Sequence, residues 1–273
     1  MSHSIWEKEG TLAHGFWNNG KLTDCPVYDM HGHMNHLNSI YFPRSSPAEV
    51  AAHIRRAGVK RLVYCSHPAL WGLCRNTEMI KECASEPDVL RMYMAINPNY
   101  REEIREDLAN YDKFKPWVFG LKLLPDYHKT AATDAKYQYA LDFANERGLP
   151  VLIHTWGGSP FDGGAVMLEL VQKYSQIKFL LGHSIFGEWE YARRCVQESA
   201  GNVYLELTSI PGNMSDLERL TALVGSEKLI FGTDMPWFDE YQAIGGVLAA
   251  DITEEDKRNI FYRNVERIFG KDW

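Results

Sequence analysis

Eight short apolar runs, each about as long as a β-strand, alternate with helix-like segments along the 273-residue chain. Each run is continuously apolar and rich in Val, Ile, Leu, Phe or Tyr, which is typical of parallel strands covered on both faces. In order, the runs read PVYDMHG, VKRLVYCSH, VLRMYMAINP, VFGLKLLP, LPVLIHTW, IKFLLGHS, NVYLELTS and KLIFGTDMPW. Eight is the number of parallel strands, joined by helices, that closes into a (β/α)8 barrel.

The segments between the runs carry signals for helix ends. Ser46 is a predicted N-cap that forms a capping box with Glu49, and Gly58 is the predicted stop. A second helix is predicted from Thr133 to Gly148 by the same signals. The remaining helices are predicted over residues 253–270 and near 76–86, 100–113, 165–174, 187–200, 214–224 and 239–250.

The fold class predicted from this alternation is α/β, a distorted (β/α)8 TIM barrel that forms one catalytic domain over residues 26–273. An open doubly wound sheet is the alternative, but no glycine-rich dinucleotide-binding motif follows the first run. Residues 1–25 are predicted to be an N-terminal extension. Asn19 and Gly20 suit a type I′ turn, so we expect a short hairpin within residues 11–24.

The composition restricts the classes of partner. The net charge of −7 argues against a protein that binds nucleic acid by electrostatic attraction. No apolar run approaches the ~20 residues of a membrane span, and the first residues lack the apolar core of a signal peptide. The five cysteines form no C-x-x-C pair, which favours reduced thiols. We therefore expect a cytoplasmic protein with a small-molecule substrate and no nucleic-acid or membrane partner, and we allow for a homodimer.

Ionisable side chains follow the apolar runs at the same end of several strands. Side chains two apart on a strand point to the same face, so His31 and His33 project together from the end of the first strand. The other strand ends supply Lys122, His154, His183 and Asp234. In a barrel, the carboxyl ends of the strands form the active face. Burying these groups together is costly unless a cation pairs with them, and imidazole and carboxylate are natural ligands of zinc and similar ions.

The order His-x-His, Lys, His, His, Asp on strands one, four, five, six and eight resembles the amidohydrolase superfamily. The segments DMHGHM, GLKLLP, IHTW, GHSIFG, FGTDMPW and RNVERIFG resemble its short-chain amidohydrolase-2 branch over about residues 26–270. The members of this branch are metal-dependent TIM-barrel hydrolases and related decarboxylases. The first 25 residues lie outside the resemblance.

The resemblance implies roles for the residues at the strand ends. His31, His33 and Asp234 would hold the more buried metal, while His154 and His183 would hold a second ion or one of them would join the first. Zinc is the expected metal, manganese is the alternative, and one or two ions are allowed. Lys122 matches a lysine that some members carbamylate to bridge two metals; otherwise it stays an ammonium group that pairs with Asp234 or with a substrate carboxylate.

The catalytic residues implied by the same resemblance are Asp234, His183 and Lys122. Asp234 would accept a proton from water and pass it to the leaving group, and His183 would stabilise the oxyanion if it is not a ligand. The predicted substrate-binding residues follow the strand ends and are His67, Asn97, Trp156, Ser184, Thr208 and Trp237. Arg44 is expected to be exposed, although it could bind a carboxylate.

Three functions fit these residues. The first is a hydrolase that uses metal-activated water on an amide, lactone or ester bond, which a bridging Lys122 would favour. The second is a non-oxidative decarboxylase of an aromatic or unsaturated carboxylic acid. The third, a barrel that binds a ligand without catalysis, is disfavoured by the complete set of ligands.

Overall fold

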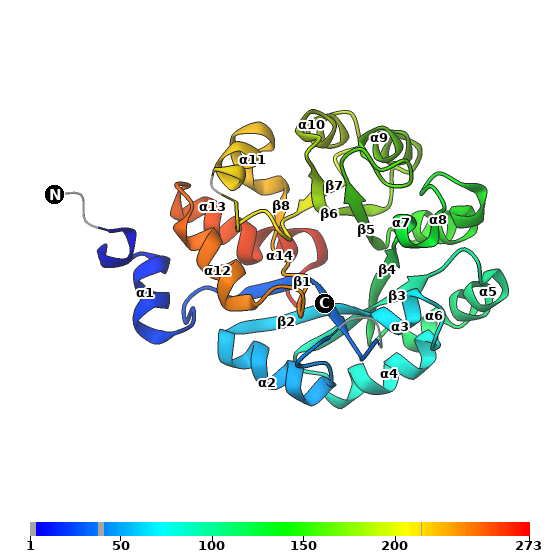
Figure 1. Ribbon diagram of the computed structural model, residues 1–273, viewed down its shortest axis with the longest axis horizontal. Helices are drawn as coiled ribbons and strands as arrows, with labels where there is room; N and C mark the ends of the chain where they lie inside the picture. Colours follow the sequence, from blue (N-terminus) through cyan, green and yellow to red (C-terminus); the bar gives the residue numbers. More distant parts are fainter. Residues whose placement is uncertain (1–3, 38–40, 214) are drawn as a thin grey trace.

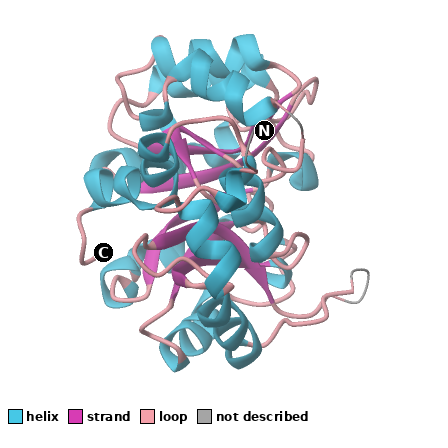
Figure 2. Cartoon of the chain, turned by 90° about the vertical axis from the view of Figure 1, so that its left-hand side faces the viewer, coloured by secondary structure: helices cyan, strands magenta, loops and turns pink. Residues whose placement is uncertain are grey.

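In the computed structural model, residues 4–37, 41–213 and 215–273 are described. In this part of the chain, eight parallel strands follow one another around the sheet in sequence order. Figure 1 shows the strands at the centre with the helices around them, and Figure 2 shows the same strands enclosed by helices from the side. The strands are β1 (Val27–Met34), β2 (Val59–Ser66), β3 (Leu90–Ile96), β4 (Val118–Leu123), β5 (Pro150–Trp156), β6 (Lys178–Phe186), β7 (Val203–Glu206) and β8 (Leu229–Ile230). The predicted TIM barrel is therefore confirmed.

The segments between the strands form the outer layer. The first part of the chain forms η1 (Ile5–Glu7) and α1 (Leu12–Asn19). The helices after β1 to β4 are α2 (Pro47–Ala57), α3 (His67–Leu70), α4 (Asn76–Ser85), α5 (Arg101–Ala109), α6 (Tyr111–Phe114), α7 (Pro125–His128) and α8 (Ala135–Arg147). Those after β5 to β8 are α9 (Gly164–Lys173), α10 (Trp189–Gln197), α11 (Asp216–Val224), η2 (Ser226–Lys228), α12 (Glu240–Ala249), α13 (Glu254–Arg258), the π-helix η3 (Asn259–Arg263) and α14 (Asn264–Phe269).

Hydrogen bonds between β1 and the segment after β8 close the barrel. The amide of Met30 donates to the carbonyl of Phe231 at 3.0 Å, and the amide of Asp234 donates to the carbonyl of His31 at 2.6 Å. The amide of His33 donates to the carbonyl of Met235, also at 2.6 Å. The last and first strands are thereby joined at the level of the histidines, and this junction fixes Asp234 beside His31.

The core has two parts, one between the strands and the helices and one inside the barrel. Met30 on β1 packs inside the barrel, and His31, the next residue, faces the cavity at its mouth. Strict alternation would send these neighbours to opposite faces. The pairing of β1 with β2 shifts register between Asp29 and Gly32, and this irregularity turns both His31 and His33 toward the barrel axis.

The structure corrects two expectations, one about a hairpin and one about the first residue of a helix. Residues 12–19 form helix α1 rather than a hairpin, with Thr11 as the N-cap and Gly20 as the C-cap at φ 68°. Gly20 supplies the left-handed backbone conformation that both a type I′ turn and a helix end require. Figure 1 shows α1 outside the ring of helices, beside α12. The second correction is that Asp134, not Thr133, caps α8.

The capping box of Ser46 and Glu49 and the stop at Gly58 are confirmed. The predicted helix over 253–270 is present, but its middle is the π-helical turn η3. No helix in the described ranges is both long enough and apolar enough to cross a lipid bilayer.

Candidate metal centre

A cavity of about 310 Å³ opens at the carboxyl end of the barrel strands. Its lining combines imidazoles, one lysine and one carboxylate with aromatic side chains. The lining residues are His31, His33, His67, Lys122, Leu124, Tyr127, His154, Trp156, His183, Ser209, Asp234, Trp237 and Phe238. The structure thus brings together all six of the strand-end residues that the sequence singled out as metal ligands.

The ring of His31 is oriented by the buried carboxylate of Glu206. Its Nδ1 lies 2.9 Å from Oε2 of Glu206, whose other oxygen accepts hydrogen bonds from the amide and the hydroxyl of Thr208. On the opposite side of the ring, Nε2 lies 2.9 Å from Nζ of Lys122. An ammonium group offers only donors, so Nε2 is the acceptor and Nδ1 carries the hydrogen. Burial lowers the pKa of His31 well below its ordinary value, which keeps the ring neutral.

His33 and His154 are oriented in the same manner. Nδ1 of His33 lies 3.0 Å from the carbonyl oxygen of Cys65, which can only accept, so this nitrogen carries a hydrogen. Nδ1 of His154 lies 2.8 Å from Oδ2 of the buried Asp162. Partners of this kind at one ring nitrogen are typical of histidines whose other nitrogen binds a metal.

Asp234 lies at the centre of these rings. Its Oδ1 is 3.3 Å from Nε2 of His31 and 3.0 Å from Nε2 of His33, and its Oδ2 is 4.0 Å from Nε2 of His183. Burial raises the pKa of this carboxyl group, whereas positive charge on His31 and a hydrogen bond and charge from His33 lower it, and the net shift is below the ordinary value. Burial lowers the pKa of His183 to about 3, which keeps that ring neutral.

Lys122 is completely buried on β4. Burial lowers the pKa of its amine, although the carboxylate of Asp234 opposes this effect. A lowered pKa increases the fraction of free amine, which is the form that reacts with carbon dioxide to give a carbamate. The arrangement is thus compatible with either predicted state of Lys122, the ammonium or the carbamate.

Three residues that line the cavity occupy a backbone conformation that residues other than glycine rarely adopt. His183 has φ 59°, Ser209 has φ 70° and Asp234 has φ 61°. At His183 the left-handed turn continues through Ser184 and Ile185, whose φ values are 55° and 54°. The turn is fixed because the Ser184 hydroxyl donates to the carbonyl of Glu206 at 2.8 Å, and strain of this kind concentrates at functional sites.

The predicted substrate-binding residues divide into two groups. His67, Trp156 and Trp237 line the cavity, and the ring of His67 stacks on that of His33 with centroids 4.1 Å apart. Asn97, Ser184 and Thr208 do not line it. Their side chains instead bind the carbonyl of Leu70, the carbonyl of Glu206 and the carboxylate of Glu206, respectively.

Several residues of the site were not identified from the sequence. Glu206 and Asp29 are charged residues inside otherwise apolar strands, which was a usable signal for a buried polar partner. Asp29 accepts hydrogen bonds from the amides of His31 and Thr233 and thereby ties β1 to the segment after β8. Asp162 comes from a loop and carries no comparable signal. The lining residues Tyr127, Ser209 and Phe238 were also missed.

The donor set fits a divalent cation. Nε2 of His33 and Oδ1 of Asp234 face each other at 3.0 Å, and Nδ1 of the same ring donates its hydrogen to the carbonyl of Cys65. Among the described residues, no hydrogen bond reaches Oδ1 of the buried Asp234. One nitrogen of His31, one of His183 and one oxygen of Asp234 also lie within 4.8 Å of one another. Several acceptor atoms that converge on one position form the kind of site that binds a metal ion.

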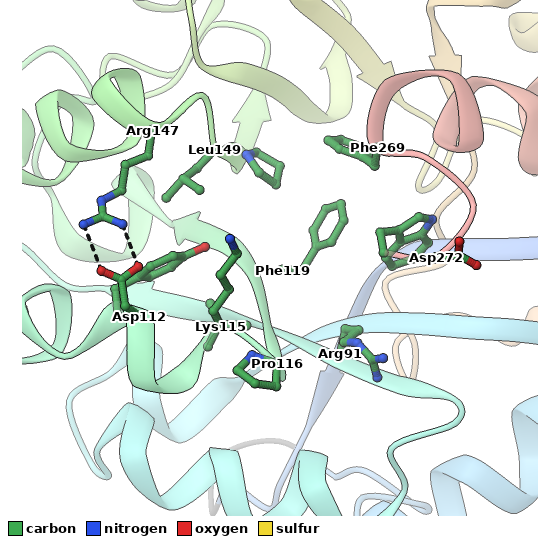
Figure 3. Close-up of a pocket in the computed structure, with 13 residues that line it drawn as sticks. Arg91, Asp112, Lys115, Pro116, Phe119, Arg147, Leu149, Phe269 and Asp272 are labelled. Carbon is green, nitrogen blue, oxygen red and sulfur yellow. Dashed lines mark hydrogen bonds and ion pairs between the residues drawn. The ribbon is translucent and has the colours of Figure 1, made fainter.

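A larger cavity, of about 700 Å³, lies at the opposite end of the strands (Figure 3). At one edge of this cavity, Arg147 forms an ion pair with Asp112, with a nitrogen–oxygen distance of 2.7 Å. Phe119 and Phe269 lie on the other side of this cavity. Its lining contains none of the histidines, so the cavity at the mouth of the barrel remains the candidate for chemistry.

Comparison with solved structures reveals the same architecture in several enzymes. The chain is 13% identical to a 5-carboxyvanillate decarboxylase of Sphingomonas paucimobilis, with a TM-score of 0.67 over 90% of this chain and 99% of that chain. A probable 2-pyrone-4,6-dicarboxylic acid hydrolase of Acinetobacter baumannii is also 13% identical, with a TM-score of 0.68 and the same two coverages. These likenesses establish the fold alone.

A third solved structure contains a metal. It is a 5-carboxyvanillate decarboxylase of Novosphingobium aromaticivorans in complex with manganese and 4-hydroxy-3-methoxy-5-nitrobenzoic acid. It is 13% identical to this chain, with a TM-score of 0.68 over 91% of this chain and 97% of that chain. No curated protein sequence matches the chain significantly. The family model described as Amidohydrolase matches residues 28–271, which span the whole barrel, and the chain therefore belongs to this family of enzymes.

Proposed function

We propose that the protein is a metal-dependent hydrolase that cleaves an amide, lactone or ester bond of a small organic substrate. The observation that carries the proposal is the carboxylate of Asp234, whose Oδ1 faces the ring nitrogens of His31 and His33 as a metal ligand would and receives no hydrogen bond from the described residues. Its other oxygen, Oδ2, lies 4.0 Å from Nε2 of His183 and is left to accept a proton. A general base for water must start unprotonated and must have an oxygen available to accept the proton. Asp234 meets both requirements at the floor of the cavity.

His31, His33 and Asp234 would hold the metal, with His183 close enough to Asp234 to complete the set. A divalent ion bound there supplies a Lewis acid that makes water more acidic and polarises a carbonyl group. Imidazole and carboxylate ligands support zinc or manganese. Manganese in the structurally similar Novosphingobium decarboxylase supports the second of these metals.

The protein's own groups would move the protons. Asp234 takes a proton from water as the water oxygen bonds to the carbonyl carbon of the substrate. When the bond from that carbon to the leaving nitrogen or oxygen breaks, Asp234 returns the proton to the leaving atom. The neutral ring of His183, if it is not a ligand, donates a hydrogen bond to the oxygen on which negative charge develops.

The cavity favours a small substrate with a flat portion. Its volume of about 310 Å³ lies at the small end of the range for ligand pockets. Trp156 and Trp237 stand at the mouth with their side chains partly exposed, and His67 stacks on His33 at the floor. We therefore propose that Trp156, Trp237 and His67 contact the substrate.

Decarboxylation of an aromatic or unsaturated carboxylic acid is the second candidate, and the same aromatic lining supports it. In that reaction the bond between the carboxyl carbon and its neighbour breaks, carbon dioxide leaves, and a proton takes its place. We place hydrolysis first because Lys122 lies on β4 among the candidate ligands, 2.9 Å from Nε2 of His31, where a carbamate would bridge two ions of a water-activating site.

Isotope labelling separates the two reactions. The metal-loaded protein is incubated with panels of lactones, esters, amides and aromatic carboxylic acids, either in water enriched in oxygen-18 or in deuterium oxide. Hydrolysis places one water oxygen in the product, while decarboxylation releases carbon dioxide and places deuterium on carbon. Turnover with oxygen-18 incorporation is expected. Release of carbon dioxide from an acid, with no hydrolysis of any panel member, would replace our proposal with the second candidate.

A further inference from the structure

Three potential ligands converge outside the active-site cavity, between α2 and the start of α12. Nε2 of His53 lies 2.7 Å from Oε2 of Glu240 and 3.0 Å from Oδ2 of Asp239. All three ligand atoms lie within 4.8 Å of one another. We propose that these side chains form a second divalent-metal site, separate from the centre at the mouth of the barrel.

The contacts between these groups are short, and the close approach and charge of Glu240 raise the pKa of His53 above its ordinary value. Nε2 of His53 and both oxygens of Glu240 are buried and have no hydrogen-bond partner among the described residues. Glu240 is completely buried, with 0% of its surface exposed. A buried carboxylate without hydrogen bonds is costly unless a cation compensates for it. The unpartnered Oε2 of Glu240 faces the ring nitrogen of His53, so the position for that cation is among these atoms.

One cationic side chain is already near the cluster. Nη2 of Arg44 lies 3.3 Å from Oδ2 of Asp239, but the Arg44 side chain is 45% exposed. The other oxygen of Asp239 accepts the amide of Tyr241 and caps α12. In the described part of the chain, Arg44 pairs with Asp239 and not with Glu240. A metal ion or a protonated His53 is therefore the cation available to the carboxyl group of Glu240.

The chemistry of the ligands indicates which ion would bind. One imidazole nitrogen and two carboxylate oxygens suit zinc or manganese, whereas magnesium and calcium prefer oxygen ligands alone. Around an octahedral ion such as manganese, neighbouring ligands subtend a right angle, and at ~2.1 Å from the ion they are separated by about 3 Å. The separations of 2.7 and 3.0 Å around Nε2 of His53 match that spacing.

The position of the cluster suggests what the ion does. Asp239 follows directly after Trp237 and Phe238, which line the active-site cavity, and the same segment begins at Asp234. An ion held by His53 would tie this segment to α2. The second site is therefore a structural one that steadies the wall of the cavity, and it does not depend on which reaction the protein catalyses.

Metal counting tests the proposal without an activity assay. The metal-free full chain is saturated with manganese, which thiols bind weakly, and the bound ions are counted by elemental analysis after the free metal is removed. His53→Gln and Glu240→Gln should each bind one ion fewer than the wild type. His14→Gln, a histidine substitution on the outer helix α1, should bind as many ions as the wild type. Equal stoichiometry in the wild type and in both folded cluster variants would overturn the proposal.

Crystals of the wild-type protein provide a second measurement that needs no variant. Anomalous diffraction from crystals soaked in zinc or manganese should show a peak between His53 and Glu240, in addition to any peak at the mouth of the barrel. A peak at the mouth with none at His53 under saturating metal would show that His53 is a protonated partner of Glu240 and that the second site does not exist.

Discussion

Nε2 of His33 and Oδ1 of Asp234 lie 3.0 Å apart, and Nδ1 of the ring faces the carbonyl of Cys65, so a ring with one hydrogen presents Nε2 to the carboxylate as an acceptor. Two acceptors this close repel each other unless a positive charge sits beside both. The pairing is therefore the geometric basis for assigning a metal to this centre, and it connects the first strand of the barrel with the end of the last.

The first prediction is that removal of either histidine of β1 removes metal. His31→Ala and His33→Ala should each lose most of the metal bound at the mouth of the barrel, because each deletes a nitrogen that faces Asp234. Elemental analysis of the purified variants measures the loss. His36→Ala is the matched control, since His36 lies three residues further on and is exposed. Unchanged metal in both β1 variants would refute the assignment.

The second prediction concerns Glu206, which holds Nδ1 of His31. Glu206→Gln keeps the size of the side chain but removes the negative charge that fixes the ring. Loss of such a partner typically costs about 10–100-fold in metal affinity or activity. Competition with a metal-binding dye measures the affinity. The exposed Glu198 offers a control, Glu198→Gln, and identical affinities in the two variants would contradict the role given to Glu206.

The third prediction concerns Gly232, which allows Glu206 to reach beneath His31. A Cβ at this position would overlap Oε1 of Glu206 and would lie 2.9 Å from Cβ of His31. Gly232→Ala should lower the free energy of unfolding by about 1–3 kcal/mol, as overpacking does, and should also weaken metal binding. Gly245→Ala is the control, because nothing lies within 4 Å of the added Cβ. Denaturant unfolding compares the two variants, and equal stability would show that the structure accommodates the added Cβ of Gly232→Ala without losing stability.

The fourth prediction is that Lys122 can be carbamylated. The free amine takes up carbon dioxide and releases a proton, and burial favours the free amine by lowering its pKa. Protein incubated with carbon-13 bicarbonate and excess metal should show a carbamate signal by NMR that Lys122→Arg lacks. Crystals from the same solution should show two ions ~3.5–4 Å apart. An unmodified amine beside one ion would establish the mononuclear alternative.

Much of the architecture could be predicted because local signals agreed with the global fold. Eight apolar runs identified the strands, and cap residues such as Ser46 and Gly58 identified helix ends. Gly20 was misread because a hairpin turn and a helix end demand the same left-handed backbone. When the apolar residues beside a glycine show only a weak helical period, the sequence does not distinguish a hairpin turn from a helix end.

The six predicted ligands converge because strand ends share one edge of a barrel, which is a topological rule. The residues that orient them were harder to find. Glu206 and Thr208 act through contacts with His31 across 175 or more positions in the chain. Asp162 reaches His154 from a loop whose path no local pattern determines. Long-range pairs of this kind depend on how strands and loops pack, so they become visible only in three dimensions.

The most direct test of the proposed mechanism is the turnover of Asp234→Asn per bound metal ion. Asparagine has nearly the same size and still offers an oxygen to the metal, but it cannot accept a proton from water. With any substrate found by the labelling assay, we expect the variant to keep its fold and much of its metal, while turnover per ion falls by the ~10²–10⁴-fold typical of a lost general base. Near-normal turnover per ion would show that Asp234 does not move the proton and would contradict the hydrolytic mechanism.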